Sequence, residues 1–137
     1  MRIFLCFVSL LFGMTVYGAV PPDPELERLT SAYRKAQTQR EMNFTSMEIC
    51  EYLDAKLLLL EKKLATKFSA TDRNKFEDLK KCWIEYRSKG VDFRASFFAG
   101  GTIRPTVANQ AYAEITEHRI TDLESLWDLL GPFEVKE

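Results

Sequence analysis

Charged residues on the apolar faces of the predicted helices are the side chains best placed for chemistry. Asp54 stands beside Leu53 and Leu57, and Arg119 interrupts an apolar row, where a buried charge must be paired. Asp54 is either a solvated residue at the edge of its face or a carboxylate turned inward toward an arginine. Arg119 either lays its stem over the core with its head in water, or pairs inward. These two residues and Arg87 could form a site, but we interpret Asp54, Arg87 and Arg119 as a structural polar cluster.

Residues typical of catalysis or metal binding are sparse. His118 is the only histidine, and the sequence has no Cys-x-x-Cys pair and no cluster of histidine with carboxylates. We also find no nucleophile paired with a base, no obvious pair of catalytic carboxylates and no cofactor motif. We therefore predict that the protein is not an enzyme and binds neither a metal nor a cofactor.

The N-terminus has the layout of a secretory signal peptide. Arg2 is followed by an apolar run, Ile3–Phe12, and then by small residues. That run is short for a membrane span, although an uncleaved anchor is the alternative. We expect cleavage after Gly18 or Ala19, with Gly18 preferred, and hence a secreted or periplasmic protein that is not held in the membrane.

The charge balance narrows the class of partner. The formal net charge is −1, and removal of Arg2 with the leader leaves 18 basic residues against 20 acidic ones. A sequence-independent nucleic-acid binder needs a basic face, and so does a protein that coats anionic membranes. We therefore expect neither a nucleic-acid partner nor a protein that coats anionic membranes.

Two cysteines, Cys50 and Cys82, remain after the leader, which carries Cys6. An oxidising compartment would allow a bond between Cys50 and Cys82. If their helices form a hairpin that turns near Ala70, the two lie about 12 Å apart along the axis, which is beyond disulfide reach. Two buried free thiols are the alternative.

An aromatic helix between Phe76 and Gly100 organises the rest of the chain. Its apolar residues recur at alternating steps of three and four, typical of one helical stripe. They are Phe76, Leu79, Trp83, Tyr86, Gly90, Phe93 and Phe97. We expect Trp83, Tyr86 and Phe93 to anchor the core. Gly90 indicates either the close approach of another helix or a local bend.

Three further helices are predicted. Asp23 caps a weaker N-terminal helix that ends near Met42 and is broken at Asn43–Thr45. Thr45 and Glu48 fit a capping box for the second helix, which closes near Phe68. The last helix runs from about Val107 to Leu130.

Together these elements predict an all-α protein, a small antiparallel bundle of three long helices plus the weaker N-terminal helix. We divide the chain into a signal peptide (1–18), an N-terminal segment with a short helix (19–44), a helical domain (45–131) and a tail (132–137).

The long connection before the last helix contains two glycines and a proline. Its residues are Gly100, Gly101, Thr102, Ile103 and Arg104, and Pro105 disfavours a helical conformation at Arg104. This double-glycine loop is either a helix C-cap followed by a crossover, or an exposed surface on which Ile103 and Arg104 bind a partner.

Four short motifs in this order resemble the lysozyme-inhibitor LprI-like N-terminal domain family of exported bacterial proteins. They are Asp54-x-x-Leu57, Trp83-Ile84-x-Tyr86-Arg87, Gly100-Gly101-Thr102-Ile103-x-Pro105, and Tyr112-x-x-Ile115-Thr116-x-x-Arg119 with Leu123. The resemblance spans roughly Glu41 to Leu130. The chain departs from the family in having Leu58 where Asn is common, and it lacks the family's common cysteine pair, whose places fall near Val91 and at Tyr112.

The resemblance implies an exported protein that binds and blocks a lysozyme. Our own hypothesis is that the double-glycine loop is the projection that fills the enzyme's cleft. The alternative is an envelope adaptor that binds another protein or itself through an aromatic or Leu-rich face, without any effect on lysozyme.

Overall fold

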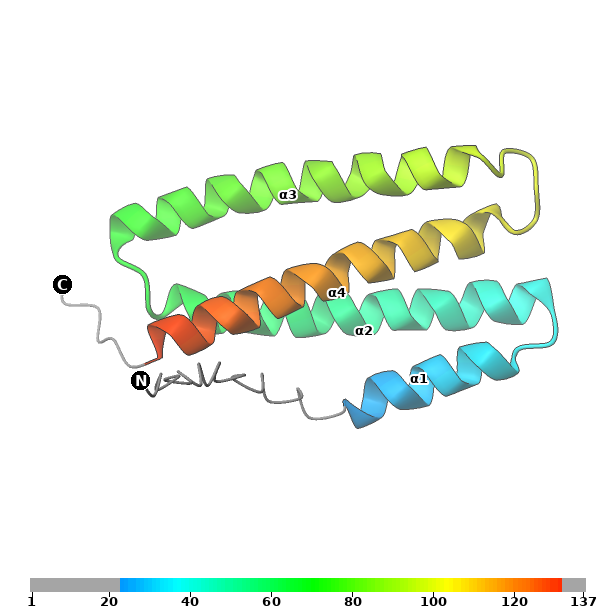
Figure 1. Ribbon diagram of the computed structural model, residues 1–137, viewed down its shortest axis with the longest axis horizontal. Coiled ribbons are helices and arrows are strands. Elements are labelled where there is room, and N and C mark those ends of the chain that lie inside the picture. The colour runs from blue at the N-terminus through cyan, green and yellow to red at the C-terminus, as the bar shows by residue number, and fades with distance from the viewer. Residues whose placement is uncertain (1–22, 132–137) are drawn as a thin grey trace, which may run out of the picture.

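The computed structural model describes residues 23–131, which form four helices (Figure 1). They are α1 (Pro24–Lys35), α2 (Gln39–Ala65), α3 (Ala70–Ser96) and α4 (Arg104–Leu130). Three long helices and a shorter N-terminal one confirm the predicted all-α bundle. Within residues 23–131, no helix is both long and apolar enough to cross a membrane. The expected signal peptide and C-terminal tail lie outside the described residues.

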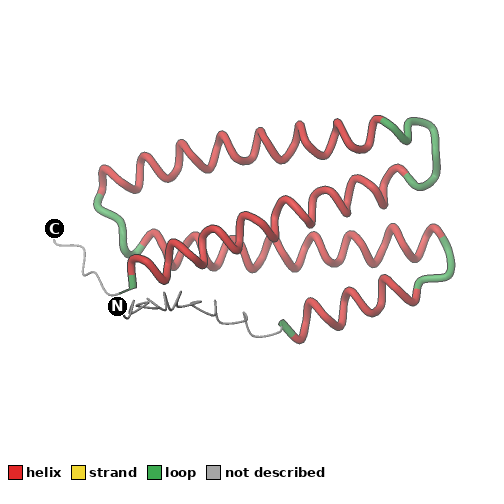
Figure 2. Tube along the Cα trace, in the orientation of Figure 1, coloured by secondary structure: helices red, strands yellow, loops and turns green. Residues whose placement is uncertain are grey.

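Helix α4 is the central helix that joins the two other long helices. It packs against both α2 and α3, while α1 packs on α2. Figure 1 shows α4 between α3 and α2, with α1 alongside the first half of α2. Figure 2 shows that the α1–α2 turn and the α3–α4 corner lie at the same end of the molecule. There the Gln39 side chain donates to Thr106 Oγ1 at 2.7 Å, and Thr106 in turn donates to Asn43 Oδ1.

The core lies where α2, α3 and α4 meet. Its buried members are apolar and mostly recur at helical spacing on each helix. They are Leu53, Leu57, Leu64, Phe76, Ile120 and Leu123. Trp83 is half-buried and packs against this cluster.

Two of the expected core anchors are wrong. Tyr86 is 64% exposed and Phe93 is 66% exposed. The face of α3 that meets α4 carries Phe76, Trp83 and Arg87, which are seven and four residues apart. Tyr86 and Phe93 are seven residues apart on a neighbouring line, so they point past α4.

Close helix contact explains the glycine in α3. A Cβ built on Gly90 would lie 3.0 Å from Cδ1 of Ile115 on α4. The two helices therefore approach closely at this point, which favours the first of the two interpretations of Gly90.

The break between the first two helices falls earlier than the sequence indicated. The expected break at Asn43–Thr45 and the capping box of Thr45 and Glu48 are wrong, because α2 is continuous from Gln39. The Thr45 hydroxyl donates to the Glu41 carbonyl at 2.8 Å, so threonine is accommodated inside the helix. The true capping box is seven residues upstream, where Thr38 Oγ1 accepts from the Glu41 amide at 3.2 Å.

Removing the true cap should cost measurable stability. We expect Thr38→Ala to lower the free energy of unfolding by about 1 kcal/mol, because the substitution leaves a first-turn amide of α2 without its acceptor. Thr45→Ala is the matched control and should change it by less than about half as much, since that hydroxyl caps nothing. Urea denaturation of both variants, followed by circular dichroism, measures the difference. Equal losses would show that Thr38 is not the working cap.

Candidate functional site

The α3–α4 corner, residues 97–104, is an exposed but hydrogen-bonded turn that includes the first residue of α4. Gly100 has a φ of 79°, a left-handed conformation that favours glycine. The amide of Gly101 donates to the Phe98 carbonyl at 3.1 Å, and the amide of Arg104 donates to the Gly101 carbonyl at 3.2 Å. Each residue from Gly100 to Arg104 is exposed. The corner therefore projects from the bundle as a defined turn.

Arg104 is the first residue of α4, so the expectation that Pro105 excludes it from the helix is wrong. Proline fits in the first turn because the amides there have no acceptor within the helix. The Arg104 side chain makes no hydrogen bond or ion pair with any residue from 23 to 131. Its charge adds to the positive end of the α4 dipole. The corner thus presents a cation suited to a carboxylate.

The structure brings Asp54 and Arg87 together between α2 and α3. Arg87 Nη1 donates to Asp54 Oδ1 at 2.8 Å and to Thr116 Oγ1 at 3.0 Å. The guanidinium carbon lies 4.5 Å from the ring centre of Trp83 and 3.9 Å from that of Tyr112. Asp54 is therefore the inward-turned carboxylate of the two alternatives, although it keeps partial contact with water.

Tyr112 completes this arrangement, and the sequence did not indicate its role. Its hydroxyl donates to Asp54 Oδ2. Burial raises the pKa of Tyr112 to about 12, and the hydrogen bond to Asp54 adds to the effect. The phenol is therefore neutral at physiological pH and acts as a hydrogen-bond donor. The spacing of Tyr112 on α4, four residues before Thr116, was the feature of the sequence that could have indicated this role.

Arg119 does not join Asp54 and Arg87. It is buried near the rings of Phe76 and Trp83, with its guanidinium carbon 5.8 and 5.7 Å from their centres. Its Nε and Nη2 have no hydrogen-bond partner among residues 23–131. Burial lowers the pKa of Arg119, and the charges of Glu61 and Asp122 oppose that change. Arg119 is therefore largely buried and forms no close ion pair, so neither alternative is realised in full.

Replacing Arg119 should not destabilise the protein in the way that loss of a structural ion pair would. We expect Arg119→Met to leave the free energy of unfolding unchanged or to raise it by about 1–3 kcal/mol, because methionine fills the space without buried, unpartnered donors. Thermal and urea denaturation measure this. A loss of more than about 2 kcal/mol would show that the Arg119 charge is paired in the folded protein.

The two cysteines of the described residues are free, so of the two alternatives the free thiols are realised, although only Cys50 is buried. Cys50 is buried and its thiol donates to the Asn109 carbonyl at 3.2 Å. Burial, together with the charge of Asp54, raises the pKa of Cys50 to about 11. Cys82 is exposed on α3, since its side chain points away from α4.

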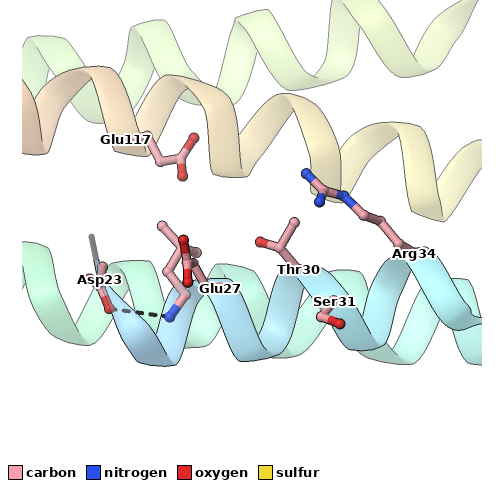
Figure 3. Close-up of a pocket in the computed structure, with 7 residues that line it drawn as sticks. Asp23, Glu27, Thr30, Ser31, Arg34 and Glu117 are labelled. Atoms are coloured by element: carbon pink, nitrogen blue, oxygen red, sulfur yellow. Dashed lines mark hydrogen bonds between the residues drawn. The ribbon is translucent and has the colours of Figure 1, made fainter.

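A hollow of about 530 Å³ lies between α1 and α4, and the sequence did not indicate it. Figure 3 shows Glu117 on α4 facing α1, with Thr30 and Arg34 on the opposite side. Burial raises the pKa of Glu117. Asp23, at one end, caps α1 and accepts from Tyr52 at 2.7 Å, so its carboxylate is already occupied. We assign this hollow no activity.

Potential metal ligands do not cluster in the part of the chain from 23 to 131. No three histidine, cysteine or carboxylate side chains group there as a metal site would require. His118 is exposed and lines two further hollows, one between α4 and the helices α1 and α2, and one between α4 and α3.

Comparison with known proteins bears on these surfaces. A family model described as lysozyme inhibitor LprI matches residues 30–123, from α1 to most of α4. This range includes the Asp54–Arg87 pair, the corner and Arg104. No curated protein and no solved structure matches the chain.

Proposed function

Because the chain belongs to the LprI lysozyme inhibitor family, we propose that it inhibits a lysozyme by placing the α3–α4 corner in the enzyme's cleft. Family membership supports an inhibitor with a protein partner. It gives no support for an enzymatic activity of the chain itself. The choice of the corner, and of the cleft as its target, rests on the chemistry of Arg104.

The exposed, unpartnered Arg104 is the observation that carries this proposal. A lysozyme cleaves its glycan substrate with a pair of carboxyl groups in the cleft of the enzyme, and at least one of them is ionised. A guanidinium matches a carboxylate in geometry as well as in charge. Ile103, which is also exposed, would supply apolar contact beside it. Occupying the cleft is sufficient for inhibition, because the polysaccharide then has no access.

Export is part of the same proposal, since a lysozyme acts on the cell wall outside the cytoplasm. The leader-like residues 1–18 supply the signal, and the chain from Ala19 onward is the active form, secreted or periplasmic.

Titration of lysozyme activity with the purified chain from Ala19 onward tests the function. The loss of turbidity of a bacterial cell-wall suspension is followed at increasing protein concentration. We expect inhibition to saturate near one protein per lysozyme. Undiminished hydrolysis at micromolar excess would contradict the proposed function.

One observation favours a second candidate function, that of an envelope adaptor. Helix α3 exposes a line of large apolar side chains, Leu79, Tyr86, Phe93 and Phe97. An adaptor would use this line to bind another protein or a second copy, and it would leave lysozyme activity unchanged in the titration above.

A further inference from the structure

We propose that the exposed aromatic ridge of α3, formed by Tyr86, Phe93 and Phe97, is part of the surface that binds lysozyme. This inference rests on the proposed function, and it extends the contact from the corner along the outer side of α3.

The corner alone is too small to form a stable interface with an enzyme. A standard stable interface takes roughly 800 Å² and 20–30 residues from each partner. The segment Gly100–Arg104 has five residues, two of which lack side chains. An inhibitor that used only this segment would bind weakly, so further surface close to the corner must take part.

The ridge supplies apolar area next to the corner. Tyr86, Phe93 and Phe97 are 64%, 66% and 70% exposed. With about 200 Å² for each aromatic side chain, the ridge leaves roughly 400 Å² uncovered. A patch of this size is at the level that marks binding surfaces on monomeric proteins. Together the ridge and the corner approach the area that a stable interface takes.

The ridge is continuous with the corner along α3. Phe97 is the C-cap residue of α3 and the first residue of the corner, and Phe93 lies one turn before it. Tyr86 follows about 10 Å farther along the helix, given 1.5 Å of rise per residue. A partner seated on Arg104 therefore meets Phe97 first, then Phe93, and Tyr86 last.

The two phenylalanine rings of the ridge are already ordered against each other. The ring centres of Phe93 and Phe97 lie 5.1 Å apart with the planes nearly perpendicular, an edge-to-face contact. Binding would therefore fix few additional rotamers. Aromatic side chains of this kind are enriched among the residues that dominate binding energy.

Alanine variants of the ridge test the inference by their inhibition constants. We expect Phe93→Ala and Phe97→Ala each to weaken inhibition roughly 10- to 30-fold, and Tyr86→Ala to weaken it less. Leu59→Ala is the matched control, because Leu59 is 68% exposed on α2, away from the ridge, and should change inhibition less than about twofold. Thermal denaturation checks that each variant remains folded, as truncation of exposed side chains predicts.

The outcomes separate this inference from the function on which it rests. If the wild-type chain inhibits and the phenylalanine variants inhibit equally well, the ridge proposal is wrong and the function stands. If the wild-type chain does not inhibit, the proposed function fails and the ridge proposal fails with it. Sedimentation velocity gives the oligomeric state. A wild-type dimer that Phe97→Ala converts to monomers would assign the ridge to a second copy and overturn its assignment to lysozyme.

Discussion

Arg104→Glu is expected to abolish lysozyme inhibition, with an inhibition constant roughly 100-fold or more above that of the wild type. The substitution removes the one cation that the corner offers to the cleft and places a carboxylate against carboxylates. A fully desolvated charge pair contributes about 2–5 kcal/mol when one partner is removed, and about 2.7 kcal/mol corresponds to 100-fold. Arg104 is exposed, so the fold should be unaffected.

A variant with the same change of charge at the other end of the molecule is the control for Arg104→Glu. Lys62, exposed near the C-terminal end of α2, is suitable. Lys62→Glu should inhibit like the wild type at physiological ionic strength, where charges more than about 8 Å away are screened. Equal losses in the two variants would mean that net charge, and not the Arg104 contact, controls binding.

Arg87→Ala is expected to give the largest loss of stability among the polar residues, about 2–4 kcal/mol. Arg87 joins α2, α3 and α4, because it contacts Asp54, Thr116 and the rings of Trp83 and Tyr112. Alanine removes these contacts and leaves Asp54 with a single partner, Tyr112. Breaking a buried pair costs 3–5 kcal/mol. The value here is set lower because Asp54 keeps contact with water.

The control for Arg87→Ala is Lys81→Ala, which breaks an exposed pair with Asp78 and should leave stability unchanged. Urea denaturation measures both variants. A structural role also predicts that folded Arg87→Ala protein inhibits lysozyme like the wild type at low temperature. A stable variant that no longer inhibits would instead place Arg87 in the binding surface.

Local signals in the sequence predicted most of the fold. Long apolar stripes at helical spacing identified α2, α3 and α4, and Asp23 followed by Pro24 marked the start of α1, where the Asp23 carboxylate accepts from the Leu26 amide at 3.2 Å. The charge of Asp54 on an apolar face left two alternatives open, and the pairing with Arg87 favours the inward-facing one.

The orientation of α3 could not be predicted from its own sequence. Apolar residues at steps of three and four cover more than one face of a helix, and only the neighbouring helix decides which face is buried. The burial of Arg87 concealed the true inner face, because the sequence places a charge there. Tyr86 and Phe93 looked like core residues and are surface residues for the same reason.

The position of Arg119 shows a second limit of sequence reasoning. Its place in an apolar row indicated burial, but the row contains no information about distance to an acid on another helix. In the fold, Arg119 lies near the rings of Phe76 and Trp83, while Glu61 is bound by Lys80 at 2.6 Å. Tertiary geometry therefore decided which charges were paired.

Hydrogen exchange of the chain with and without bound lysozyme tests most directly whether the corner binds the enzyme. We expect slower exchange of amides from Phe93 to Thr106 on binding, with α1 and the α1–α2 turn unchanged. Inhibition accompanied by protection of α1 or α2, with unaltered exchange in the corner, would contradict it.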